Sequence, residues 1–179
     1  MEHLKRIIGV DKSVNVIGVV SIPDIVFNEI YQKIRRLFGR FRIHVKKLDK
    51  KRKRQFLYRL LLNMDDFYAK GLDFWAVLLM KPIKRLRKQI PLVISRIIKS
   101  YYCVSAYVCT NLDVGNWILA DEIRKILGNV KVFRTNLHEA VEIADAITNL
   151  YRYCRECVFG KMSHLFIRRL TETGRVIII

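Results

Sequence analysis

Two apolar runs close to the N-terminus place the strongest constraint on how this chain can fold. They cover residues 6–10 and 16–22, and both are rich in β-branched side chains. Only the short, mostly polar segment 11–15 separates them. β-Branched runs on either side of a brief polar break are typical of two neighbouring strands joined by a turn. The sequence therefore predicts a strand hairpin at the start of the fold.

Helical and strand patterns alternate after this hairpin. Helical spacing follows Pro23 over residues 24–38, and alternating apolar and charged residues over 41–45 predict a half-buried third strand. The later helices are expected near residues 56–64, 86–101, 117–127 and 136–153, and the later strands near 74–80, 104–109 and 130–133. The tail 175–179 is predicted to be an edge strand or a contact with a partner. This order predicts a single α/β domain over residues 1–179, with a mixed sheet and crossover helices.

The balance of charge narrows the choice of partner. The 179 residues include 34 Lys or Arg and 16 Asp or Glu, which gives a formal net charge of +18 at pH 7. Segments 33–59 and 81–99 hold most of the basic excess, whereas 111–145 holds more acids than bases. Such a surplus attracts polyanions and causes self-repulsion when none is bound. We therefore expect a nucleic-acid partner. An anionic membrane surface and a merely solubilising basic face are the alternatives.

Several classes of protein are excluded by composition and by missing motifs. Hydrophobic residues make up 51% of the chain, which excludes a disordered basic tail. No apolar run is long enough to span a bilayer, and the N-terminus lacks the pattern of a signal peptide. The chain is therefore expected to be soluble and cytoplasmic. Neither GxxxxGK[ST] nor GxGxxG occurs, which argues against nucleoside-triphosphate and dinucleotide cofactors.

Three aspartates occupy positions that can carry chemistry. Asp11 directly follows the first predicted strand, and Asp113 closes another predicted strand. The ends of strands are where α/β sheets commonly form ligand sites. Asp145 lies on the last long predicted helix, on a face that it shares with His138 and Glu142. Polar faces of this kind are most often simply exposed to solvent, but the positions of the other two aspartates favour a functional face.

Three carboxylates at one site would repel each other unless a cation offset their charge. Mg²⁺ and Mn²⁺ are suited to this, since hard cations prefer oxygen ligands. Two such ions about 4 Å apart can activate a water molecule and stabilise the leaving oxygen of a phosphodiester. The positions of the aspartates are therefore compatible with metal-dependent hydrolysis of nucleic acid.

The segments around Asp11 and Asp145 resemble ribonuclease-H-like nucleases. Residues 7–13 read Ile-Ile-Gly-Val-Asp-Lys-Ser, and with the apolar run that follows they resemble the first hairpin of that superfamily, whose first strand carries a metal-binding Asp. Residues 142–147 read Glu-Ile-Ala-Asp-Ala-Ile. They resemble the final helix, with a Gln-x-Ala-Asp motif, of an uncharacterised branch whose first strand carries Asp-Glu-Ser-Gly. This chain departs from the branch where it has Lys12 in place of Glu.

The resemblance implies a ribonuclease-H-like fold and a two-metal nuclease that acts on RNA or DNA with Mg²⁺ or Mn²⁺. The metal ligands that it implies, which are also the implied catalytic residues, are Asp11, Asp113 and Asp145. Glu142 or His138 would assist them. Lys12 beside Asp11 would weaken cation binding or replace a cation. The alternative is therefore a noncatalytic nucleic-acid-binding protein, or a ribonucleoprotein subunit, with a degenerate nuclease fold.

Basic side chains from two segments are expected to hold the phosphate backbone of the nucleic acid. They are Lys47, Lys50, Lys51, Arg52, Lys53 and Arg54 in the first segment, and Arg85, Arg87 and Lys88 in the second. A homodimer and a ribonucleoprotein partner are both left open by the sequence.

Overall fold

A mixed sheet of six strands forms the centre of the computed structural model, which describes residues 4–39, 42–102 and 104–179. The strands are β1 (Arg6–Ser13), β2 (Val16–Pro23), β3 (Asp73–Leu78), β4 (Val104–Val108), β5 (Lys131–Arg134) and β6 (Val176–Ile178). Their order across the sheet is β5-β4-β1-β2-β3-β6. β1, β2 and β3 pair antiparallel, while β4, β5 and β6 join the sheet through parallel pairs. The mixed α/β architecture predicted from the sequence is confirmed.

The predicted N-terminal hairpin is confirmed, but the predicted third strand over residues 41–45 is wrong. β1 and β2 pair along their whole length. Residue 41 lies outside the described residues, and Val45–Lys47 forms a short 3₁₀ helix, η1. Ile43 and Val45 are buried. The alternation of apolar and charged residues therefore reflects burial of the apolar side chains of a segment that is not a strand. β3 is the third strand, and it pairs antiparallel with β2.

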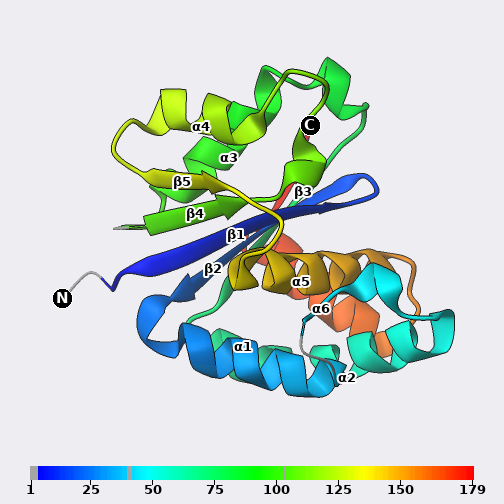
Figure 1. Cartoon of the computed structure of the whole chain (residues 1–179). Coiled ribbons are helices and arrows are strands. Elements are labelled where there is room, and N and C mark those ends of the chain that lie inside the picture. Colours follow the sequence, from blue (N-terminus) through cyan, green and yellow to red (C-terminus); the bar gives the residue numbers. More distant parts are fainter. Residues whose placement is uncertain (1–3, 40–41, 103) are drawn as a thin grey trace.

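Helices cover both faces of the sheet. They are α1 (Asp24–Phe38), α2 (Lys50–Ala69), α3 (Gln89–Lys99), α4 (Leu119–Leu127), α5 (Glu139–Arg155) and α6 (Lys161–Glu172). α5 packs on β1 and β2, with α1, α2 and α6 outside it, while α3 and α4 cover the opposite face (Figure 1). The sequence patterns did not predict α6. Within the described ranges, no helix is long and apolar enough to cross a membrane.

Two glycines let α5 approach the hairpin closely. A Cβ atom on Gly9 would lie 2.0 Å from the carbonyl oxygen of Ala140, and one on Gly18 would lie 1.8 Å from Oγ1 of Thr148. Glycine in a strand commonly marks such a close approach of another backbone. The contact brings the sheet-facing residues of α5 against the end of β1, where Asp11 lies.

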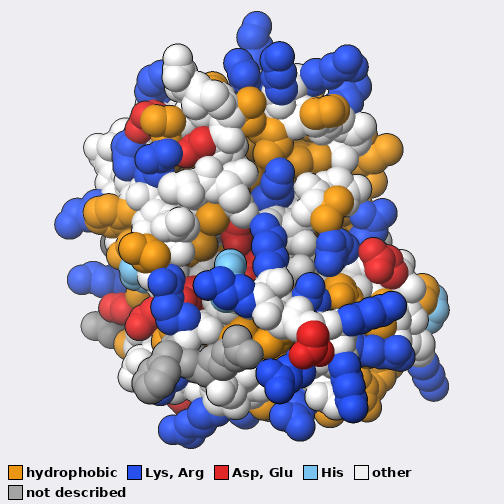
Figure 2. All heavy atoms as spheres, turned by 45° about the vertical axis from the view of Figure 1, so that its right-hand side comes forward, with side chains coloured by type: hydrophobic (Ala, Val, Ile, Leu, Met, Phe, Trp, Pro, Cys, Tyr) orange, Lys and Arg blue, Asp and Glu red, His pale blue; other side chains and the backbone are white. Residues whose placement is uncertain are grey.

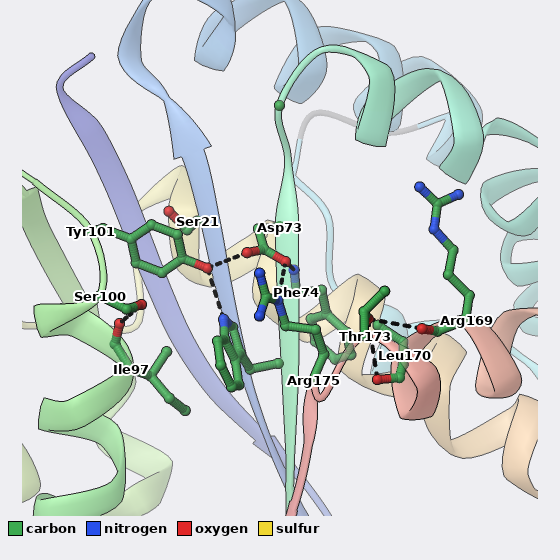
Figure 3. Close-up of polar contacts among 12 residues, drawn as sticks. Ser21, Asp73, Phe74, Ile97, Ser100, Tyr101, Arg169, Leu170, Thr173 and Arg175 are labelled. Atoms are coloured by element: carbon green, nitrogen blue, oxygen red, sulfur yellow. Dashed lines mark hydrogen bonds and ion pairs between the residues drawn. The ribbon is translucent and has the colours of Figure 1, made fainter. Parts of the chain in front are cut away.

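A polar cluster fixes the other end of the sheet, where β1 and β3 begin. The Tyr101 hydroxyl donates to Oδ2 of Asp73 at 2.5 Å and accepts from Nε1 of Trp75 at 2.7 Å. Nε of Arg175 donates to Oδ1 of the same Asp73 at 2.9 Å (Figure 3). These contacts tie the chain after α3 and the chain before β6 to β3. Because each of these side chains has a hydrogen-bond partner, the cluster serves to hold this end of the sheet together.

Candidate active site

A cavity of about 330 Å³ lies at the end of the sheet where β1 and β4 finish. Its lining includes three acidic residues, Asp11 from β1 and Glu142 and Asp145 from α5. It also includes four basic or imidazole side chains from the segment between α1 and α2, namely Arg42, His44, Lys46 and Lys47. The fold thus brings together acids that are far apart in the sequence.

Asp11 is a buried carboxylate that is held in place by two donors. Its side chain is 4% exposed. Its Oδ1 accepts from the backbone N–H of Lys12 at 2.7 Å and from Nδ2 of Asn111 at 2.6 Å. Burial, followed by the nearby charge of Asp145, raises the pKa of Asp11 to about 6. The contribution of Asp145, which lines the same cavity, is the repulsion expected between two neighbouring carboxylates.

Asp145 is the second buried carboxylate of the cavity. Its Oδ2 accepts from the backbone N–H of Val45 at 3.2 Å, and its Oδ1 accepts from Nδ2 of Asn149 at 2.9 Å. Burial raises its pKa, although the charges of Lys46 and His44 oppose this rise. The segment around Val45, which the sequence patterns predicted as a strand, therefore lines the cavity and supplies a backbone N–H to Asp145.

A hydrogen-bonded link joins the two elements that carry these aspartates. The Ser13 hydroxyl, at the end of β1, donates to Oδ1 of Asn149 at 3.1 Å. Nδ2 of Asn149 in turn donates to both the backbone oxygen and Oδ1 of Asp145. Ser13 and Asn149 are buried, so the link fixes the position of Asp145 relative to β1.

Glu142 lies in the same cavity, but its charge is already compensated. Its Oε2 accepts from the Tyr31 hydroxyl at 2.6 Å, and its Oε1 forms an ion pair with Nε of Arg42 at 2.8 Å. Burial and the Glu142 carboxylate raise the pKa of Tyr31, so the hydroxyl keeps its proton. Glu142 therefore anchors Arg42 and the segment above the cavity.

Neither Asp113 nor His138 is among the residues that line the cavity. Asp113 follows the 3₁₀ helix η3 (Thr110–Leu112), which turns the chain away from the end of β4. Its carboxylate accepts from the N–H of Leu119 at 3.1 Å and pairs with Nε of Arg134 at 2.7 Å.

His138 caps the N-terminus of α5. Its Nδ1 accepts from the N–H of Ala140 at 3.0 Å, and its ring stacks on Tyr107 with 3.4 Å between the ring centroids. Burial lowers the pKa of this imidazole, so His138 is neutral at pH 7 and serves the helix rather than the cavity.

Comparison with known proteins identifies the fold but not a family. No family model matches the sequence, and no curated protein matches it. Among solved structures, a chain in the structure of the PCNA:RNase HII complex from Archaeoglobus fulgidus is similar, with a TM-score of 0.52 and 17% sequence identity. The match covers 96% of this chain and 90% of that chain.

The chain has a ribonuclease-H-like fold. The fold class that the sequence predicted is thus confirmed. At 17% identity the likeness concerns the fold alone. The resemblance to the branch with the Asp-Glu-Ser-Gly motif stays a prediction.

The ribonuclease-H-like fold implies a divalent cation, and the donors of the cavity fit one in part. Among the described residues, no group of three or more His, Cys, Asp or Glu could hold a metal ion. Asp11 and Asp145, however, are two hard oxygen donors whose repulsion a divalent cation would relieve. Mg²⁺ is usually held by one or two carboxylates, with water and substrate phosphates as its other ligands. The pair offers two of the oxygen ligands that one such ion would need, and a second ion would need donors beyond it.

The predicted phosphate-binding residues lie around the same end of the sheet. β3 ends at Leu78, which pairs with Val16 beside the tip of the hairpin, so the segment with the second basic group emerges there. That group is Arg85, Arg87 and Lys88. The first group follows η1 and continues into α2; it comprises Lys47, Lys50, Lys51, Arg52, Lys53 and Arg54. Figure 2 shows Lys and Arg side chains spread over much of the face turned toward the viewer, with Asp and Glu side chains fewer and scattered among them.

The site differs from the sequence prediction mainly in its degree of burial. α5 is buried on every side from Ala140 to Tyr151. Glu142 and Asp145 therefore do not lie on a solvent-exposed face, although polar residues of a helix most often do. The helix lies between the sheet and the outer helices.

The patterns also missed Arg42 and Asn111 as site residues. The only signal for Arg42 was the basic and apolar alternation of its segment.

Proposed function

We propose that this protein is a metal-dependent nuclease that hydrolyses phosphodiester bonds of RNA or DNA at the cavity containing Asp11 and Asp145. The observation that carries this proposal is the meeting of two buried carboxylates under a basic rim, in a chain with a net charge of +18. A protein with so few acids would gain stability by separating them. Their shared burial favours a function that needs paired negative charge.

The two aspartates would hold Mg²⁺ or Mn²⁺ in this proposal. When bound, such an ion polarises a phosphoryl oxygen and makes a water molecule more acidic. Asn111 and Asn149 orient the two carboxylates by donating to them. The ammonium groups of Lys46 and Lys47, which line the same cavity, bind the phosphate oxygens of the nucleic acid.

Covalent catalysis by the one thiol of the cavity is unfavourable. Burial, followed by the charge of Asp11, raises the pKa of the Cys109 thiol to about 12. A thiol must lose its proton to act as a nucleophile, so Cys109 stays neutral and unreactive at pH 7. Direct attack by water on the phosphodiester is therefore the reaction that the site supports.

Cleavage assays with matched variants test this function. Labelled single-stranded, duplex and hybrid oligonucleotides are incubated with Mg²⁺ or Mn²⁺ and the wild-type protein, Asp11→Asn or Asp145→Asn. We expect each variant to lose about 100-fold or more in rate, since even residues that only orient metal ligands are commonly worth 10–100-fold.

Asp113→Asn is the control, because this aspartate lies outside the cavity and is paired with Arg134. It should keep most of the activity. Equal background cleavage by the wild type and by both cavity variants would overturn the enzymatic proposal. The protein would then be a noncatalytic nucleic-acid-binding protein.

A further inference from the structure

We infer that the nucleic acid bound by this protein is single-stranded. Its path runs from the candidate active site through a second, basic cavity to an aromatic groove beside α2. The inference rests on the proposed function for its substrate, but the residues that carry it lie mostly outside the Asp11 and Asp145 cavity.

The basic cavity adjoins the acid pair. Its lining includes four cationic side chains, Lys12, Lys46, Lys53 and Arg152. It shares Lys46 and Asn111 with the candidate active site, so the two cavities are contiguous. Among the described residues none of the four cations forms an ion pair.

Arg152 adds a second indication of a ligand in the basic cavity. Its Nε is buried without a hydrogen-bond partner among the described residues. A buried donor without a partner is costly, and the Arg152 side chain that carries it lines the basic cavity, where its charge attracts a phosphate. The basic cavity is therefore suited to one or more backbone phosphates next to the acid pair.

The aromatic groove is lined by α2 and by the chain after α5. Tyr58 of α2 is 42% exposed, and its ring lies 5.6 Å from that of Phe159. Lys51 and Arg54 line the same groove. An exposed aromatic ring beside cations is an arrangement on which an unpaired base stacks while the backbone is held electrostatically, and the partly buried Phe159 supports Tyr58.

A row of ring contacts connects the basic cavity with the aromatic groove. The guanidinium of Arg152 lies 5.5 Å from the centre of the Tyr153 ring. That ring is 6.5 Å from the ring of Phe159, which in turn packs against Tyr58. On α2, Lys53 lines the basic cavity and the next residue, Arg54, lines the groove. A single strand can therefore place a phosphate in one and a base in the other.

The groove favours a single strand over a duplex because stacking requires an exposed base face. In a duplex the base faces are covered by their neighbours, and unpaired bases are the ones that stack on protein rings. Two other aromatic rings of the sheet are already engaged. Tyr107 stacks on His138 and Phe133, and Tyr101 bonds to Asp73. Tyr58, which is exposed and lies beside the cations of the groove, is the ring that we place on the path of the strand.

Fluorescence anisotropy with a labelled oligonucleotide, single-stranded or annealed to its complement, tests the inference. EDTA is present, so binding is measured without cleavage. Tyr58→Ala should weaken binding of the single strand about 5- to 150-fold, as expected for the loss of one stacked base. Tyr58→Phe should restore it, and duplex binding should be unchanged. Tyr102→Ala is the control, because this exposed tyrosine precedes β4 at the opposite end of the sheet.

The salt dependence separates stacking from charge. Lys53→Gln should reduce the slope of log K against log salt by about 0.7, the value for one phosphate contact on a single strand, whereas Tyr58→Ala should leave that slope unchanged. Wild-type protein that binds duplex at least as tightly as single strand, with no effect of Tyr58→Ala on either, would overturn the inference.

The inference and the proposed function can fail separately. Selective single-strand binding that depends on Tyr58, with no cleavage under any metal condition, would support the inference and refute the nuclease. Metal-dependent cleavage of duplex that is insensitive to Tyr58→Ala would refute the inference and support the nuclease.

Discussion

At the scale of single residues, Asp11 shows what a buried charge does to the folded state. Its pKa is about 6 in the folded protein, against about 3.9 for an unperturbed Asp. Between about pH 4 and pH 6 the folded state therefore binds more protons than the unfolded state. It follows that this residue makes the protein less stable as the pH rises through that range, and that its ionised form opposes folding at pH 7.

Replacing Asp11 by Asn should stabilise the metal-free protein at pH 7. The amide oxygen can still accept from Lys12 and Asn111, and the repulsion from Asp145 is lost. We expect the free energy of unfolding to rise by on the order of 2 kcal/mol at pH 7, and the gain to vanish below about pH 4. Urea unfolding in EDTA at both pH values measures it. A variant that is less stable than the wild type at pH 7 would contradict this account.

At the scale of elements, the position of α5 depends on the two hairpin glycines. Gly18→Ala should lower the free energy of unfolding by about 1–3 kcal/mol, the usual cost of forcing a methyl group into a filled core. Because the Thr148 side chain, or α5 with it, must shift to make room, Mg²⁺ affinity and cleavage should fall as well. Thermal unfolding and a cleavage assay on the same preparation check both.

Gly115→Ala is the matched control for that substitution. Gly115 has a φ of +58°, and a Cβ there would meet no atom within 4 Å. The variant should lose stability through its backbone alone and keep its metal affinity. If Gly18→Ala bound Mg²⁺ as well as the wild type, the close approach of α5 would not be what positions Asp145.

Elements with strong apolar patterns could be predicted, and those fixed by distant partners could not. The hairpin and β4 are marked by β-branched runs, and Asp11 and Asp145 stand out by their positions. The burial of α5 is different, because its polar residues are satisfied by Tyr31 and Val45, which belong to other segments. Likewise, only the turn of η3 shows why Asp113 does not line the cavity. Nothing in a local pattern reports such partners.

At the scale of the whole molecule, the fold gathers dispersed basic segments around one end of the sheet. The net charge of +18 predicts a nucleic-acid affinity that depends strongly on salt. The triple substitution of Lys51, Lys53 and Arg54 by Gln should weaken binding and flatten its salt dependence, since these residues line the proposed path. A matched triple substitution of Arg96, Lys99 and Arg124 removes the same charge elsewhere and should have a smaller effect. Anisotropy titrations at several salt concentrations compare the two.

The most direct test of the central claim is calorimetric titration of Mg²⁺ and Mn²⁺ into the protein without nucleic acid. The wild type should bind the cation, with an affinity that rises between about pH 5 and pH 7 as Asp11 loses its proton. Asp11→Asn and Asp145→Asn should each abolish or greatly weaken binding, and Asp113→Asn should not. Equal binding by the wild type and both cavity variants, or binding lost only in Asp113→Asn, would contradict the account.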